Sequence, residues 1–202
     1  MRKARAIAMT QTTLGPQALV IVTGPARSGK SEWAEGLAAT WQSVIYVATS
    51  QADPDDQEWQ ARLDLHRQRR PAQWQLQEVP VDLAGAIAQA PAGACLLIDS
   101  LGTWLANLLE QDETQWQSTL ADLCAAIAAR QSAVIIVAEE TGWGVVPAYP
   151  VGRLFRDRLG TAVRSLSAIA DAVHLVTGGY ALNLTQLGTP LTALAIAPQA
   201  PK

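Results

Sequence analysis

The sequence is poor in cysteine, in long apolar runs and in positive charge. Its two cysteines, Cys95 and Cys124, form no CxxC motif and lie in apolar stretches, which predicts buried free thiols rather than a disulfide or a metal site. No apolar run approaches the roughly 20 residues of a membrane span. Residues 1–16 lack the apolar segment of a secretory signal. We therefore predict a disordered N-terminal tail over residues 1–16 and a cytoplasmic protein.

Positive charge is also scarce relative to negative charge. The chain has 15 Lys and Arg against 18 Asp and Glu, a formal net charge of −3, which predicts no nucleic-acid partner. A length of 202 residues with 49% hydrophobic and 16% charged residues is typical of one globular domain with a substantial core. We assign this domain to residues 17–180 and expect an edge strand and a tail over 181–202.

One glycine-rich segment dominates the sequence. It fits the pattern of glycine, four residues, glycine, lysine and serine, and reads Gly24-Pro25-Ala26-Arg27-Ser28-Gly29-Lys30-Ser31. An apolar run over 18–23 precedes it and a helical pattern follows. In such a P-loop the backbone N–H groups and the helix N-terminus bind phosphates. Lys30 is expected to reach the β- and γ-phosphates and Ser31 to bind Mg²⁺.

Short apolar strands alternate with helices along the rest of the chain. We predict strands at 18–23, 44–48, 75–79, 94–99, 133–138 and 172–177, and helices at 31–41, 55–69, 81–90, 103–109, 112–130 and 153–170. The pattern predicts an α/β fold with a mainly parallel sheet covered by helices on both faces, a P-loop NTPase architecture of the RecA-like kind. Pro147 and Pro150 are expected to keep the preceding segment as a loop.

Polar residues collect at the predicted carboxyl ends of the strands, where ligands bind in such folds. They are Thr49, Ser50, Asp99, Glu139 and Glu140. Asp99 is expected to orient hydrated Mg²⁺, and its alternative role is the N-cap of the next helix.

The two histidines differ in their surroundings. His174 lies within an apolar strand and is expected in the core or at a sheet edge. His66 lies on a charged helix with Arg62, Arg67, Arg69 and Arg70. A solvated surface histidine is the default interpretation, yet nearby arginines would also stabilise a bound phosphate and keep the imidazole neutral and nucleophilic.

Several motifs in series give this chain a family resemblance over about residues 18–178. Besides the P-loop they include Tyr46-Val47-Ala48-Thr49-Ser50, His66-x-x-x-Arg70-Pro71, Leu97-Ile98-Asp99-Ser100-Leu101, Glu140-x-Gly142-x-Gly144 and Arg153-x-Phe155-Arg156-Asp157-x-x-Gly160. The chain resembles the bifunctional adenosylcobinamide kinase/adenosylcobinamide-phosphate guanylyltransferases of cobalamin synthesis.

The resemblance implies a two-step reaction. A nucleoside triphosphate, ATP or GTP, phosphorylates the hydroxyl of adenosylcobinamide. GTP then transfers GMP to a histidine, here His66, with loss of pyrophosphate, and the cobinamide phosphate takes up the GMP. The resemblance further implies Mg²⁺ in both steps and a homotrimer. Residues assigned to nucleotide binding are the P-loop, Thr49, Ser50, Arg62, Glu78 and Asp99, with Lys30 and His66 catalytic.

The chain also departs from the family pattern. Glu139 stands where the family usually has asparagine, Val163-Arg164 where it usually has Asn-Gln, and Trp59 where methionine is frequent. These departures leave the P-loop and His66 intact and concern subunit contacts, nucleotide preference or the balance of the two activities. Beside the family reading, two alternatives stay open: an unrelated P-loop kinase of small molecules, in which His66 is an ordinary surface residue, and a RecA-like nucleotide-switched binding protein. A family variant restricted to guanylyl transfer is a third.

Overall fold

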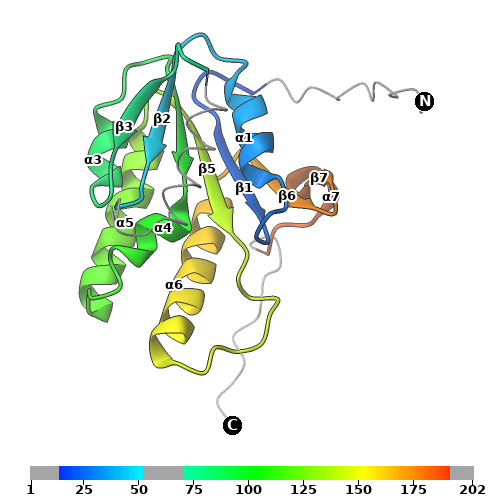
Figure 1. The fold of residues 1–202 in the computed structure, drawn as a ribbon. Helices are drawn as coiled ribbons and strands as arrows, with labels where there is room; N and C mark the ends of the chain where they lie inside the picture. The colour runs from blue at the N-terminus through cyan, green and yellow to red at the C-terminus, as the bar shows by residue number, and fades with distance from the viewer. Residues whose placement is uncertain (1–13, 52–70, 192–202) are drawn as a thin grey trace, which may run out of the picture.

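The protein forms a seven-stranded sheet with helices on both faces (Figure 1). The structure is a computed structural model and describes residues 14–51 and 71–191. The strand order is β3-β2-β4-β5-β1-β6-β7. The first six strands along the chain are parallel, and β7 pairs antiparallel with β6 at one edge. The predicted mainly parallel α/β sheet is thus confirmed.

The strands are short, as expected for a parallel sheet buried on both faces. They are β1 (Leu19–Gly24), β2 (Val44–Ala48), β3 (Gln75–Glu78), β4 (Cys95–Asp99), β5 (Ala133–Glu139), β6 (Ala172–Thr177) and β7 (Tyr180–Asn183). Successive side chains of β1 enter two different cores: Leu19 and Ile21 pack on one side of the sheet, and Val20 and Val22 on the other. This period of two is why the central strands, such as β1 and β5, are apolar at nearly every position, whereas the edge strand β3 is polar and exposed.

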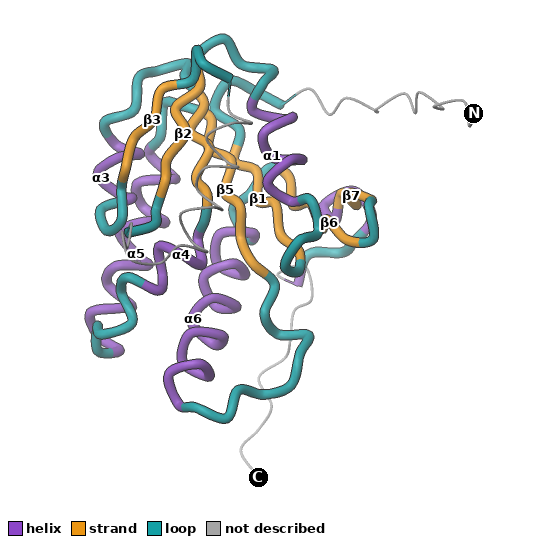
Figure 2. Tube along the Cα trace, in the orientation of Figure 1, coloured by secondary structure: helices purple, strands orange, loops and turns teal. Residues whose placement is uncertain are grey.

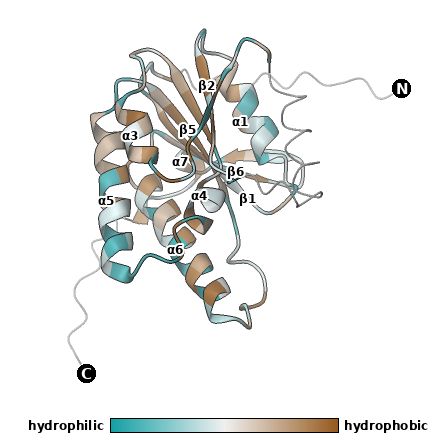
Figure 3. Cartoon of the chain, turned by 60° about the vertical axis from the view of Figure 1, so that its left-hand side comes forward, coloured by the Kyte–Doolittle hydropathy of each residue, from teal (hydrophilic) through white to brown (hydrophobic). Residues whose placement is uncertain are grey.

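The helices divide between the two faces, as Figure 2 shows. They are α1 (Lys30–Ala38), α3 (Leu83–Ala88), α4 (Leu101–Ala106), α5 (Glu113–Ala129), α6 (Pro150–Ser167) and α7 (Leu184–Leu187). Helix α1 packs with one core, and α3, α4, α5 and α6 pack with the other. Hydrophobic residues concentrate in the strands, whereas exposed parts of α1 and α5 are hydrophilic (Figure 3).

The structure corrects several predicted boundaries. Helix α6 begins at Pro150 instead of 153, because proline lacks the N–H that the first helical position would leave unpaired. Helix α4 begins at Leu101, and the short α7 was not predicted. The predicted helix over 55–69 and the predicted tail over 1–16 lie wholly or mainly outside the described residues.

Two sequence-based expectations about single residues are confirmed. Cys95 and Cys124 are free thiols; Cys95 is buried as predicted, whereas Cys124 is only half-buried. Burial raises the pKa of Cys95 to about 12. His174 is buried within β6. Among the described helices, none combines the length and the apolar character needed to cross a bilayer.

Candidate nucleotide-binding site

The P-loop connects the end of β1 to the start of α1. Arg27 (φ 59°) and Gly29 (φ 91°) adopt left-handed conformations, which turn the chain sharply into the helix. Gly24 sits so close to β6 that an added Cβ would overlap the carbonyl oxygen of Val176. The Lys30 Nζ donates to the carbonyl oxygen of Pro25 at 3.4 Å, so the ammonium bends back over the loop.

Two features of this loop suit a phosphate ligand. The N–H groups at the start of α1 are directed along the helix axis, where an anion is stabilised. The Ser28 hydroxyl is buried and finds no hydrogen-bond acceptor or donor among the described residues. Burying a hydroxyl without a hydrogen-bond partner costs free energy, which indicates that a ligand or water supplies the missing hydrogen bond.

Helix α1 is held to the sheet by a polar pair. Trp33 Nε1 donates to His174 Nδ1 at 2.8 Å, and the two rings meet edge to face with centroids 5.7 Å apart. Burial lowers the pKa of His174, because the charged imidazolium would lose its hydration. The neutral ring is the form whose Nδ1 can accept this bond, so burial and hydrogen bonding favour the same protonation state.

Asp99 ends β4 on the face of the sheet that α1 covers. Cys95 and Leu97 belong to the core beneath α1, and strand alternation puts Asp99 on that same side. The Tyr46 hydroxyl donates to Asp99 Oδ2 at 2.9 Å and orients the carboxylate. The N-cap of α4 is Ser100, whose side chain accepts from the Thr103 N–H, so the alternative N-cap role for Asp99 is wrong.

Glu139 supports this region from β5, the strand between β1 and β4. Its carboxylate accepts from Ser100 Oγ at 2.5 Å and from the Gly102 N–H at 2.9 Å. A Cβ on Gly102 would overlap that carboxylate, so the start of α4 and Glu139 fit each other closely. The next residue, Glu140, donates its N–H to the Gly24 carbonyl at 2.9 Å and links β5 to the P-loop.

Thr49 and Asn107 join the ends of β2, β3 and β4. The Thr49 hydroxyl is buried. It donates to the Ser100 carbonyl at 2.7 Å and accepts a hydrogen bond from the Ser100 N–H at 2.9 Å. Asn107 Nδ2 donates to the carbonyls of Thr49 at 2.8 Å and Pro80 at 2.9 Å. The Thr49 side chain therefore braces the site and does not face it, whereas the predicted ligand Glu78 is exposed at the end of β3, beside Ala48.

The structure brings most of the predicted residues to one edge of the sheet. The P-loop, Ser50, Glu78 and Asp99 all lie at or beyond carboxyl strand ends. His66 and Arg62 lie outside the described residues. Sequence reasoning missed the supporting side chains Tyr46, Ser100 and Asn107, because each acts across a long sequence separation with no local signature.

A P-loop after the first strand of a parallel sheet, with an oriented carboxylate two strands away, defines a P-loop nucleotide-binding protein. Residues 20–184 match the model of the cobinamide kinase / cobinamide phosphate guanyltransferase family. The chain belongs to this family. It is a bifunctional kinase and guanylyltransferase of cobalamin biosynthesis.

Two relatives agree with this assignment, and a solved structure shares the fold. The bifunctional adenosylcobalamin biosynthesis protein CobP of Pseudomonas aeruginosa is 38% identical over 85% of this chain and 98% of its own length. The bifunctional adenosylcobalamin biosynthesis protein CobU of Escherichia coli is 35% identical over 82% of this chain and 99% of its own length. An ATPase from the type III secretion system of pathogenic bacteria has a TM-score of 0.51 at 12% identity, over 88% of this chain and 60% of its own, which shows the fold alone.

Proposed function

We propose that this enzyme phosphorylates adenosylcobinamide with a nucleoside triphosphate, then transfers GMP from GTP to the product through a covalent guanylyl-His66 intermediate. The observation that supports the phosphotransfer step best is the P-loop, with Lys30 and the start of α1 on the same face of the sheet as Asp99. The acceptor substrates follow from the family. The intermediate rests on the sequence around His66.

In the kinase step the P-loop would bind the triphosphate. The α1 N–H groups and Lys30 stabilise the charge of the β- and γ-phosphates. Mg²⁺ prefers oxygen ligands, and the Ser31 hydroxyl together with the Asp99 carboxylate supplies that donor set. When bound, the ion would neutralise charge on the phosphates. Tyr46 holds the Asp99 carboxylate in place for this purpose.

In the guanylyl step a His66 ring nitrogen would attack the α-phosphorus of GTP. A phosphorus–nitrogen bond forms, the bond to the bridging oxygen breaks, and pyrophosphate leaves. The phosphate of cobinamide phosphate then attacks the same phosphorus and releases the histidine. Arg62, four residues before His66, would share its helical face and stabilise the transferred phosphate.

The proposal extends to the protein's surroundings. We infer a homotrimer that acts in the cytoplasm on small molecules, with adenosylcobinamide, ATP and GTP as substrates and no nucleic-acid partner. The net charge of −3 supports the last point, since nucleic-acid binding requires a positive field.

The test is covalent labelling with GTP labelled at the α-phosphate, in the presence of Mg²⁺. We expect label on the denatured protein that is lost in mild acid and survives mild base, because a phosphoramidate is acid-labile. His66→Ala should remove the label and keep the kinase activity. His174→Gln, at the only other histidine, serves as the control and should keep the label. Acid-stable label, or label that persists in folded His66→Ala, would contradict the intermediate.

A further inference from the structure

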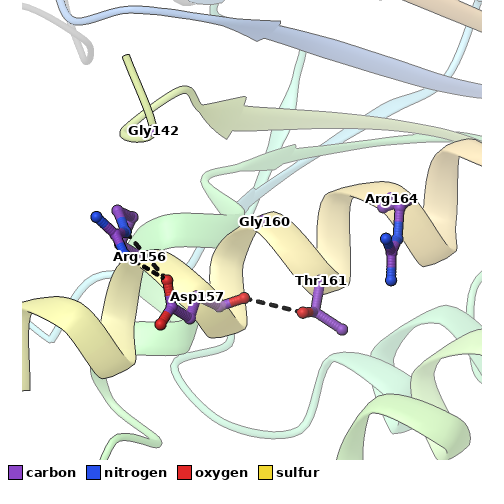
Figure 4. Close-up of a pocket in the computed structure, with 6 residues that line it drawn as sticks. All are labelled: Gly142, Arg156, Asp157, Gly160, Thr161 and Arg164. Atoms are coloured by element: carbon purple, nitrogen blue, oxygen red, sulfur yellow. Dashed lines mark hydrogen bonds and ion pairs between the residues drawn. The ribbon is translucent and has the colours of Figure 1, made fainter. Parts of the chain in front are cut away.

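A groove on the outer side of α6 lies next to the start of the loop that links β5 to α6. It has a volume of about 390 Å³ and is lined by Gly142, Arg156, Asp157, Gly160, Thr161 and Arg164 (Figure 4). Arg156, Gly160 and Arg164 follow one another at intervals of four along α6, so they share one face of the helix. Figure 4 shows Arg156 and Arg164 at the two ends of this stretch, with Gly160 between them.

Gly160 has no structural reason to be glycine. It lies inside an 18-residue helix, its φ is an ordinary helical one, and an added Cβ would meet no atom within 4 Å. A glycine in a helix interior costs about 1 kcal/mol relative to alanine. The absent side chain leaves the floor of the groove bare, which indicates that space at this point is used by something other than the chain itself.

The groove and its rim carry two arginines and two carboxylates, and Arg164 is the cation that no carboxylate pairs with among the described residues. Arg156 is held by Asp157, whose Oδ1 accepts from Nε at 3.0 Å and from Nη2 at 2.9 Å. The carboxylate of Glu140, near the opposite rim, accepts the Gly142 N–H at 2.8 Å. Both nearby carboxylates thus accept hydrogen bonds from groups at the groove. The Arg164 guanidinium forms no hydrogen bond or ion pair with any residue in 14–51 or 71–191, and it is exposed.

Position connects the groove with the P-loop. Glu140 donates to the Gly24 carbonyl, and Gly142 on the groove's rim is only two residues further along. Two residues span at most about 7 Å. The Cα atoms of Arg156 and Arg164 each lie about 6 Å along the helix from Gly160, so a small anion above Gly160 is within reach of both side chains.

We propose that this groove binds a phosphate monoester or polyphosphate group, held by Arg164 and Arg156 above Gly160 with the Thr161 hydroxyl beside it. Guanidinium forks match phosphate oxygens in geometry and charge. The site rests on the proposed function, because that function supplies two sources of the ligand: the phosphate of cobinamide phosphate and the phosphates of a nucleotide.

The experiment separates the two sources by using the two half-reactions. The full-length enzyme is first loaded with GMP from GTP, freed of nucleotide, and mixed with increasing cobinamide phosphate in single-turnover transfer. In a parallel arm, the formation of guanylylated enzyme is measured against GTP concentration. If no guanylylated enzyme forms at all, the proposed function has failed, and this outcome is distinct from failure of the groove.

Arg164→Gln should raise the half-saturating concentration about tenfold in the arm that supplies the ligand, and Arg164→Lys should raise it less, because charge is kept and the fork is lost. A rise in the first arm identifies the acceptor phosphate, and a rise in the second identifies the nucleotide. Gly160→Ala should have the same effect by filling the floor. Gly36→Ala in α1 is the matched control, since its Cβ also meets nothing within 4 Å.

The proposal is overturned if Arg164→Gln and Gly160→Ala leave both arms unchanged in enzyme that still becomes guanylylated. It is also overturned if weaker binding in Arg164→Gln comes with a changed molecular mass by light scattering, because Arg164 would then be a contact between subunits.

Discussion

Single side chains in this site are placed by partners far away in the sequence. Asp99 is oriented by Tyr46 on the neighbouring strand, and the first turn of α4 is fixed by Glu139. Such contacts decide where a carboxylate points, which bears on the Mg²⁺-ligand role that we propose for Asp99. Two substitutions test these effects separately: Lys30→Ala removes a charge from the P-loop, and Tyr46→Phe removes the hydroxyl that orients Asp99.

Lys30→Ala should abolish the kinase step and strongly weaken triphosphate binding in a protein that still folds. Lysine acts on the phosphates as a point charge, and its hydrogen bond to the Pro25 carbonyl, at 3.4 Å, is weak. Kinase turnover with ATP and nucleotide titration by calorimetry measure the loss, and circular dichroism checks the fold. Unchanged turnover would show that the P-loop takes no part in phosphotransfer.

Tyr46→Phe should raise the Mg²⁺ concentration that gives half-maximal kinase activity several-fold and leave the maximal rate at saturating Mg²⁺ largely intact. The ring stays, and only the hydroxyl that orients Asp99 is lost, a net effect of about 1 kcal/mol. Mn²⁺ binding followed by electron paramagnetic resonance gives a readout apart from activity. An unchanged metal dependence in both measurements would mean that Asp99 is not a metal ligand.

At the scale of elements, α4 acts as a brace between strand ends. Its N-terminus is held by Glu139, while Trp104 Nε1 donates to the Val81 carbonyl at 2.7 Å and Asn107 reaches the carbonyls of Thr49 and Pro80. This one short helix therefore fixes the ends of β2 and β3 relative to β4 and β5. Ser50 and Glu78, which we predict to bind nucleotide, lie at the strand ends that this brace holds.

Asn107→Ala should lower the free energy of unfolding by about 1–3 kcal/mol, because two carbonyls lose their donor. Asn107→Asp has the same shape but no donor and points a carboxylate at both carbonyls, so it should be at least as destabilising. Urea denaturation measures both. Ala106→Ser, at the exposed neighbouring position, is the control and should change the midpoint little. Stability equal to wild type in Asn107→Asp would contradict the brace.

Helices, strands and the P-loop could be predicted from the sequence better than the side-chain contacts between distant residues. The buried strands β1, β2, β4, β5 and β6 were predicted because apolar β-branched runs signal burial locally, whereas β3 was predicted from the alternation of its residues. The P-loop was predicted because its chemistry is contiguous. The bonds from Tyr46 to Asp99 and from Glu139 to α4 could not be predicted, since they depend on strand order. Pro150 was assigned to a loop because proline breaks most helices, yet it suits the first helical position.

At the scale of the whole molecule, one buried histidine couples acidity to folding. The pKa of His174 is lowered by burial, so the unfolded chain binds a proton at higher pH than the native chain does. The contribution of neutral His174 to the free energy of unfolding is fully present above the pKa of the unfolded chain, about 6.5. It is lost as the pH falls from there through the lower pKa of the native chain. We expect wild-type stability to fall more steeply below pH 6.5 than that of His174→Gln, whose amide oxygen can accept from Trp33 without titrating. Denaturant midpoints from pH 7.5 to 5 measure the difference, and parallel curves would contradict it.

The last prediction concerns assembly. The loop between β5 and α6 exposes Trp143 (62%), Val145 (95%) and Tyr149 (77%), an unusual set of apolar side chains for a free surface. Tryptophan and tyrosine are enriched in the cores of protein interfaces. We expect a mass of three chains by light scattering at micromolar concentration, and we expect Val145→Glu to lower that mass, because a buried unpaired charge opposes association. Circular dichroism must show that the variant stays folded. Since Val145 packs against little within its own chain, its loss should not unfold the monomer. A wild-type monomer with full activity would rule the trimer out.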